Sequence, residues 1–327
     1  MKPLLESNDE AAALELLHSS GCTDGLPVVI PTRERVDVLI DRVDLDPDLV
    51  LGVMGPKQGV ATVQLVAVSA VMAGCLPEYF PIVISAVRAV CRKEFDLTEV
   101  NQTTHCLAPL IVGNGNARIE CGSLNSGAGI LGPGNRANAS IGRALSLACI
   151  NIAGRKSGTT DMAIFSSPGK FSSCIAEAEE QSCFEPYHVS KGYSHEDSVV
   201  TVIGVEAPHS IICELSKDRN QDSDRLISCI ASVIANAGSN HIYCGGKGAP
   251  VVTLCPEHAR LLGESGYDRK RIQIEVTERA VMPRSIAKQL YGDLMYDNPG
   301  DGEWLRAVRD PDQIMLIVAG GMGTYSM

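Results

Sequence analysis

Leu107-Ala-Pro-Leu-Ile-Val112 and the later stretch Gly127-Ala-Gly-Ile-Leu-Gly-Pro-Gly-Asn-Arg-Ala-Asn-Ala-Ser-Ile-Gly-Arg143 decide the fold. The first stretch is a short apolar run, which predicts a buried strand. The second is a glycine-rich loop that leads into a helix over about 136–152, capped by Asn135. A buried strand followed by a loop and a packed helix predicts an α/β fold of two or three layers.

Upstream of this strand the sequence predicts several helices. Glu10–Ser19 has an amphipathic pattern, and Thr32 is a typical N-cap for a helix that extends to about Val43. Ala61–Gly74 is apolar on nearly every face, and a second apolar segment follows from Pro77 to about Lys93. Helices without a polar face are buried, so we expect a thick core layer of small-residue helices.

Downstream, residues 155–198 are polar and irregular, which predicts a connector that carries functional groups. We therefore expect two α/β subdomains, 1–160 and 161–327. Strand and helix patterns alternate beyond the connector. Strands are predicted at Val199–Val205, Ser210–Leu215, Ile242–Cys244, Val251–Leu254 and Gln313–Ala319, helices at Arg225–Ala237, Pro256–Ser265 and Pro283–Tyr291, and a mixed pattern at Arg271–Val276.

Composition excludes several classes of function. The formal net charge of −11 gives no field that would attract nucleic acid or anionic lipid. The N-terminal twenty residues lack a basic segment, and the longest apolar run is too short for a bilayer, so we expect a cytoplasmic protein without membrane contact. None of the twelve cysteines forms a C-x-x-C pair, which argues against a disulfide framework and a structural zinc site. We also expect a homo-oligomer.

The glycine-rich loop is the strongest candidate for a binding site. Glycines let a backbone approach a ligand, and the following helix directs its free N–H groups toward the loop. Such a site suits a carboxylate, a phosphate or a developing oxyanion. The alternative is an ordinary turn with a capped helix and solvated arginines. The candidate ligand-binding residues are Asn125, Ser126, Gly134, Asn135, Arg136, Asn138 and Arg143.

Two further segments carry candidate catalytic groups. Thr103-Thr-His105 precedes the apolar strand, where His105 can act as acid or base and Thr103 and Thr104 can bind a polar ligand. Its alternative is a structurally satisfied histidine.

The third segment holds Cys174 in a polar stretch, with Lys170 before it and a helix start expected nearby. A cation and a helix N-terminus both favour thiolate. Glu177 would lie about one turn later and relay a proton. The alternative is a partly buried cysteine with an acidic face beside it.

Thr23 and Asp24 form a turn before an extended segment. A structural role is the simpler interpretation, although we include both among the substrate-binding candidates. No metal ligand set is predicted. His209 and Cys213 would form a pair only on a helix, and the pattern of this segment indicates a strand.

Several long motifs resemble a poorly characterised bacterial family whose members accompany, or are fused to, a small UGSC-like domain. The resemblance covers roughly residues 20–285. The motifs are Thr23-Asp-Gly-Leu-Pro-Val-Val29, Pro31-Thr-x-Glu-Arg-Val36, Ala70-Val-Met-Ala-Gly-Cys-x-Pro-Glu-Tyr-x-Pro81, Thr103-Thr-His105, Leu131-Gly-Pro-Gly-Asn-Arg-Ala-Asn-Ala-x-Ile-Gly-Arg-Ala144, and Pro168-Gly-Lys170 with Cys174.

The resemblance implies thiol or selenol oxidoreductase chemistry, with a small partner protein that carries selenocysteine or cysteine in a U/C-G-S-C motif. This chain resembles the larger component. It lacks C-G-S-C, since Leu124 follows Cys121-Gly-Ser123. A self-contained cycle of two thiols is therefore not expected.

Three hypotheses remain open for the function. The first is a cysteine-dependent enzyme that cleaves or reduces a carbon–heteroatom bond in a small polar or anionic substrate, with Cys174, His105, Glu177 and Lys170 as catalytic groups and no cofactor. The second is a lyase or hydratase without covalent catalysis, in which His105 and Glu177 act as acid and base. The third is a subunit that binds a small thiol or selenol partner protein.

Overall fold

The computed structural model describes residues 7, 9–292 and 302–327. The chain has a mixed α/β fold, as predicted, and divides into two compact units. The first unit comprises the described residues up to Ala176 together with Tyr193–Ala207. The second comprises Glu177–Gly192 and the described residues from Pro208 onward. The division therefore differs from the expected boundary at residue 160, because 161–176 and 193–207 complete the sheet of the first unit.

The first unit is built on strand β3, Ala108–Asn114, which is buried along its whole length. Strand β4, Cys174–Ala176, pairs with it in parallel, and strand β5, Val199–Val205, pairs with it antiparallel. The backbone groups of a buried strand need partners on both sides, and these two neighbours supply them. The assignment of Val199–Val205 to a second domain was wrong, because its full register runs along β3.

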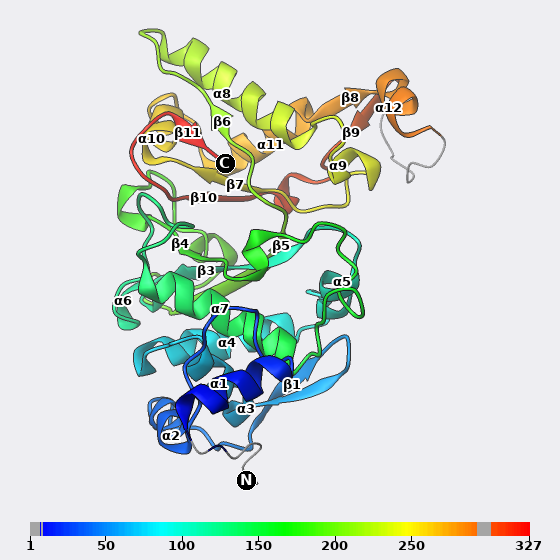
Figure 1. The fold of residues 1–327 in the computed structure, drawn as a ribbon. Coiled ribbons are helices and arrows are strands. Elements are labelled where there is room, and N and C mark those ends of the chain that lie inside the picture. The colour runs from blue at the N-terminus through cyan, green and yellow to red at the C-terminus, as the bar shows by residue number, and fades with distance from the viewer. Residues whose placement is uncertain (1–6, 8, 293–301) are drawn as a thin grey trace. The chain divides into compact units, whose positions relative to one another are not determined.

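Three helices pack together beside this sheet: α3, Val63–Met72; α4, Phe80–Val90; and α7, Arg136–Asn151 (Figure 1). Helices α4 and α7 contact the sheet, and α3 packs against both of them. Their buried faces are rich in alanine and valine, so the helices approach one another closely. The predicted layer of buried small-residue helices is thus present. The other elements of this unit are α1 Glu10–Ser19, α2 Arg33–Asp41, β1 Val50–Met54, β2 Gly59–Thr62, η1 Pro77–Tyr79, α5 Leu97–Gln102, α6 Ala117–Glu120 and η2 Pro168–Lys170.

Side-chain caps explain where the early helices begin. Thr32 accepts a hydrogen bond from the backbone N–H of Arg35, as the predicted N-cap requires, and Asp9, which was not predicted as a cap, accepts one from the N–H of Ala12. The sequence missed the β1–β2 hairpin. Its second strand runs directly into α3, so Thr62 both ends β2 and caps the helix.

The second unit contains the parallel pair β7, Val251–Leu254, and β10, Met315–Val318. Ile242–Cys244 was predicted as a strand, but Asn240–Tyr243 forms the short helix α9. The mixed pattern at Arg271–Val276 lies inside helix α11, Arg269–Arg279. The remaining elements are η3 Glu179–Gln181, η4 Val189–Lys191, β6 Ile211–Ile212, α8 Arg219–Ile234, α10 Pro256–Glu264, β8 Val281–Pro283, α12 Arg284–Tyr291, β9 Trp304–Arg306, η5 Pro311–Gln313 and β11 Tyr325–Ser326.

Within the described part of the chain, every helix is too short or too polar to cross a bilayer.

Gly142 on α7 tests the close approach of helix and sheet. A Cβ atom there would lie 2.6 Å from the backbone nitrogen of Ser173 and closer still to the Ser172 hydroxyl. Overpacking costs about 1–3 kcal/mol, and the better helix propensity of alanine offsets about 1 kcal/mol of that. We expect Gly142→Ala to lower the free energy of unfolding in urea. Gly127→Ala is the control, since its Cβ would meet its nearest neighbour at 3.5 Å. A stabilised Gly142→Ala protein would contradict the packing described here.

Candidate functional site

His105, one of the predicted site residues, forms a partly exposed pair with Glu206. Nε2 of His105 lies 2.6 Å from Oε1 of Glu206, and the two side chains are 29% and 36% exposed. A carboxylate in this position fixes the tautomer and orientation of an imidazole. The pair is therefore both accessible and oriented, which are the two requirements for proton transfer.

The β3–β5 ladder brings this pair together. His105 precedes the first residue of β3, and Glu206 directly follows the last residue of β5. The two strands are antiparallel, with Ala108 opposite Val205, so the start of one strand meets the end of the other. Two side chains a hundred positions apart thus meet at one edge of the sheet.

The chain around His105 is held by local hydrogen bonds. The His105 backbone N–H donates to Oγ1 of Thr103 at 3.2 Å. The carbonyl of Thr104 accepts from the N–H of Ile164 at 3.0 Å, which brings an exposed apolar segment beside the histidine. Within that segment Ile164 is 73% exposed and Phe165 is 95% exposed. Thr103 and Thr104 therefore lie beside His105. The exposed apolar side chains of Ile164 and Phe165 belong to the neighbouring segment, which the sequence did not indicate.

Cys174 lies in a different environment from the one predicted. It begins strand β4 and does not lie at the start of a helix, and its side chain is 2% exposed inside the core of the first unit. Burial raises the pKa of the Cys174 thiol, with smaller contributions from the neighbouring thiols of Cys121 and Cys75. The expected helix start was wrong, because the segment completes the ladder of β3. Cys174 therefore lacks the two features on which a thiolate role was based.

Lys170 does not supply a free cation to Cys174. Its Nζ donates to both carboxylate oxygens of Asp161 at 2.7 Å, and both side chains are buried. The carbonyl of Lys170 in turn accepts from Ser146 and Arg155. A buried cation needs such a partner to offset its desolvation, so this network is structural.

Glu177 belongs to the second unit, whereas Cys174 and His105 belong to the first. Its buried carboxylate accepts from the backbone N–H of Tyr187 at 2.8 Å and lies 3.7 Å from Nη2 of Arg269. These contacts attach the segment that begins at Glu177 to the start of α11. The predicted relay from Cys174 to Glu177 along a helix is wrong, because the intervening residues form a strand.

The glycine-rich loop is held largely by its own amide side chains. Asn138 is buried, accepts from the N–H of Asn125, and donates to the carbonyls of Asn125 and Cys174. The side chain of Asn125 bonds to Gly127 and Ala128 within its own loop. Both asparagines were candidates for ligand binding, but their polar atoms fix the loop against β4. Ser126 is half-buried beside them.

Helix α7 begins where predicted, but the predicted side-chain cap by Asn135 is wrong. Gly134 has φ +100°, a backbone conformation that is unfavourable for residues other than glycine. Asn135 occupies the N-cap position. The Asn135 amide donates to Gly129 across the loop instead of capping the helix. Arg136 is exposed and donates to the carbonyl of Gly74 at 3.4 Å. Arg136 thus remains near the loop, with part of its donor capacity directed to the helix layer.

Arg143 forms a structural ion pair with Asp24, so its guanidinium group is not available to a ligand in the glycine-rich loop. Its Nε and Nη2 donate to the two carboxylate oxygens of Asp24, each at 2.8 Å, and Nη2 also donates to the carbonyl of Pro27. Burial acts to raise the pKa of Asp24, but the hydrogen bonds from Arg143 and from the Leu26 backbone outweigh it, so the pKa is lowered. Beside this pair, Oγ1 of Thr23 lies 2.8 Å from Nδ1 of His18.

His105 and the glycine-rich loop lie at opposite ends of β3. Leu124 and Asn125 contact the end of the sheet, at Gly113 and Ala176, whereas His105 precedes its start. Five residues of strand separate Ala108 from Gly113, or roughly 16 Å at about 3.3 Å per residue. General acid–base chemistry needs near-contact geometry, so His105 and the loop do not form one catalytic centre.

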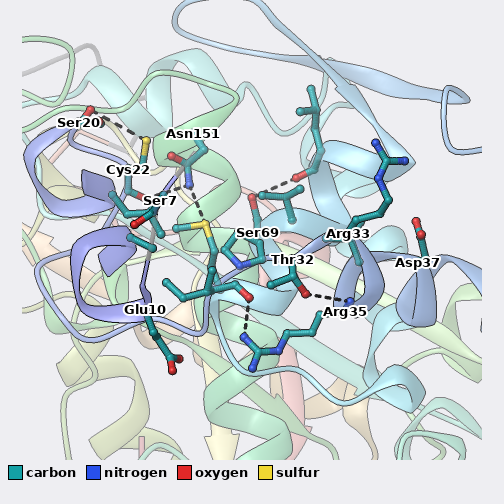
Figure 2. Close-up of a pocket in the computed structure, with 18 of the residues that line it drawn as sticks. Ser7, Glu10, Ser20, Cys22, Thr32, Arg33, Arg35, Asp37, Ser69 and Asn151 are labelled. Atoms are coloured by element: carbon teal, nitrogen blue, oxygen red, sulfur yellow. Dashed lines mark hydrogen bonds between the residues drawn. The ribbon is translucent and has the colours of Figure 1, made fainter. Parts of the chain in front are cut away.

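A cavity of about 820 Å³ lies elsewhere in the first unit, between α1, α2 and α3. Figure 2 shows its lining, in which polar groups are used within the fold: Arg35 donates to Ile30, Ser69 to Leu65, and Asn151 to Cys22. None of the predicted site residues is among the residues that line it. Its size alone does not make it a site.

Glu206 and Cys106 are the residues that sequence reasoning missed. Cys106 is half-buried next to His105, and one of its neighbours in space is Glu206. The only sequence signal for Glu206 was an acidic residue at the end of a predicted strand, which becomes informative only when the pairing of β3 with β5 is known.

No family model, curated protein or solved structure matches the chain.

Alkylation tests the placement of Cys174. In the folded protein we expect iodoacetamide to label Cys174 at least about 100-fold more slowly than the half-exposed Cys22, because burial limits both access and thiolate formation. Peptide mapping by mass spectrometry measures both rates, and urea should abolish the difference. Equal labelling of the two cysteines in the native protein would place Cys174 outside the core.

The Asp24–Arg143 pair predicts a specific pH dependence of stability. Because the pKa of Asp24 is lowered in the folded state, its contribution is present above the ordinary aspartate range and is lost as pH falls through the folded-state value. Asp24→Asn should lower the free energy of unfolding by about 2 kcal/mol at pH 7. That deficit should begin to shrink below about pH 4, where the unfolded aspartate takes up a proton. It should vanish once pH falls below the lowered folded-state pKa, where the native aspartate is neutral as well. Urea unfolding of both proteins from pH 3 to 7 measures this, and a deficit that is constant with pH would contradict the ion pair.

Proposed function

We propose that this chain is an enzyme that catalyses proton transfer without a covalent intermediate, as a lyase or hydratase acting on a small polar substrate. One observation carries the proposal: the 2.6 Å contact between His105 Nε2 and Glu206 Oε1, with both side chains partly exposed. Histidine exchanges protons near neutral pH, and a carboxylate neighbour orients it for that task. This corresponds to the second hypothesis from the sequence, with Glu206 in place of Glu177.

The surroundings of His105 support a small substrate with both polar and apolar parts. Thr104 is exposed beside the histidine, and a threonine hydroxyl can both donate and accept a hydrogen bond. Ile164 and Phe165 offer an apolar surface on the neighbouring segment. In the reaction the imidazole would take a proton from a carbon atom and, as imidazolium, return it to the hydroxyl or amine on the adjacent carbon. The bond to that group would break as the carbon–carbon double bond forms, and the group would leave as water or ammonia.

The cysteine-dependent hypothesis receives less support. Cys174 is buried and the pKa of its thiol is raised, and the Lys170 ammonium group forms a buried ion pair with Asp161. Cleavage or reduction through Cys174, and a small thiol or selenol partner protein, stay predictions that no contact described above favours.

Solvent exchange tests the proposal. The protein would be incubated in D₂O with a panel of small hydroxy- and amino-carboxylates and their unsaturated products, and proton NMR would record exchange at carbon and formation of alkene. His105→Gln should lower the rate by about 10²–10⁴-fold. Glu206→Gln should lower it at least about tenfold, because the imidazole is no longer held in one tautomer.

Cys174→Ala distinguishes this mechanism from covalent catalysis. We expect the folded variant to keep the wild-type rate within about threefold, since a spectator thiol takes no part in proton transfer. Circular dichroism and thermal unfolding establish that the variant is folded. Loss of activity in folded Cys174→Ala, or a wild-type rate in His105→Gln, would overturn the proposal. Absence of exchange with every compound of the panel would exclude this substrate class.

A further inference from the structure

Cys106 extends the histidine–glutamate pair into a group of three metal-binding side chains. One ring nitrogen of His105, Sγ of Cys106 and one carboxylate oxygen of Glu206 all lie within 4.8 Å of one another. All three residues are half-buried. The acid–base mechanism uses the histidine and the glutamate and gives Cys106 no role.

The donor set is specific for one class of cation. Nitrogen, thiolate sulfur and carboxylate oxygen are the ligands of zinc, whereas magnesium and calcium prefer oxygen alone. Three protein ligands also leave the fourth position of a tetrahedral ion open to water. Two ligand atoms at zinc bond lengths of about 2.1 Å lie roughly 3.4 Å apart. The present contact of 2.6 Å between His105 and Glu206 would therefore need to open by less than about 1 Å.

The β3–β5 ladder holds the two segments that carry the ligands next to each other, so only side-chain movement is needed to widen the contact between His105 and Glu206. His105 and Cys106 come from the segment before β3, and Glu206 comes from the residue after β5. The backbone ladder between Ala108 and Val205 anchors both segments. Two ligands from one segment and a third from the other therefore lie within three residues of a hydrogen-bonded ladder, which limits how far they can move apart.

We propose that His105, Cys106 and Glu206 bind one zinc-type divalent cation, and that this cation competes with proton transfer by His105. The ion would occupy the imidazole lone pair and the carboxylate that otherwise orients it. The binding site itself stands on the geometry of the three ligands alone, while its inhibitory effect rests on the proposed function. The pair would then be active without metal and blocked with it.

Cobalt(II) provides a probe that reports thiolate ligation directly. The full-length protein would be treated with a chelator, exchanged into buffer, and titrated with Co²⁺, and its absorption would be followed. We expect one Co²⁺ per chain, a sulfur-to-cobalt charge-transfer band, and displacement by Zn²⁺. Metal analysis after gel filtration gives the stoichiometry independently.

Variants assign the ligands. Cys106→Ser should remove the charge-transfer band, and His105→Gln and Glu206→Gln should each weaken Co²⁺ binding at least about tenfold, as expected for the loss of one of three ligands. Cys183→Ser is the matched control, because Cys183 is the exposed cysteine and belongs to the second unit. It should leave both the band and the affinity unchanged. A band that persists in folded Cys106→Ser, or wild-type protein that binds no Co²⁺ at one per chain, would overturn the metal site.

The two proposals fail separately. Proton exchange that depends on His105, in a protein that binds no metal, would overturn the metal site and leave the acid–base function. Binding of one Co²⁺ through Cys106 in a protein that exchanges no substrate proton would overturn the function and leave the site. Exchange that saturating Zn²⁺ does not slow would overturn the competition between them.

Discussion

The pairing of β3 on both of its edges is the constraint on which the first unit depends. This strand is buried along its length, so each backbone N–H and carbonyl that lacked a partner would cost a large fraction of the stability of a domain. The chain meets this requirement with two segments distant in sequence, β4 from residue 174 and β5 from residue 199. Both placements have consequences for chemistry, because one places a thiol in the core and the other brings a carboxylate to a histidine.

The parallel pairing of β4 determines the state of Cys174. In a three-residue strand beside β3, the side chain of the first residue enters the space between the sheet and the helix layer. There it behaves as a small hydrophobe, and desolvation raises its pKa. A polar local sequence around a cysteine therefore does not establish exposure. The exposure of its neighbours can differ from its own, as it does between Phe171, which is exposed, and Cys174.

Most of the charged residues that suggested a binding site form ion pairs with other residues of the chain. Lys170 pairs with Asp161, Arg143 pairs with Asp24, and Arg269 approaches Glu177. Each of these pairs lies in a buried or partly buried place, where an unpaired charge would be far more costly than in water. The His105–Glu206 pair differs because about a third of each side chain is exposed. Accessibility, and not the presence of opposite charges, distinguishes it as a site.

The sequence by itself determined much of the local structure, although not the β1–β2 hairpin, the short helix α9 or the strand at Cys174. Caps at Asp9 and Thr32, the apolar faces of α3 and α4, and the glycine-rich entry to α7 all follow from short-range rules of propensity and periodicity. Those rules also identified His105 as a residue able to transfer a proton. Only the tertiary structure decided its partner and the burial of Cys174. Both depend on which strand pairs with β3, and strand pairing is set by the free energy of burying distant segments together, for which no local pattern carries a signal.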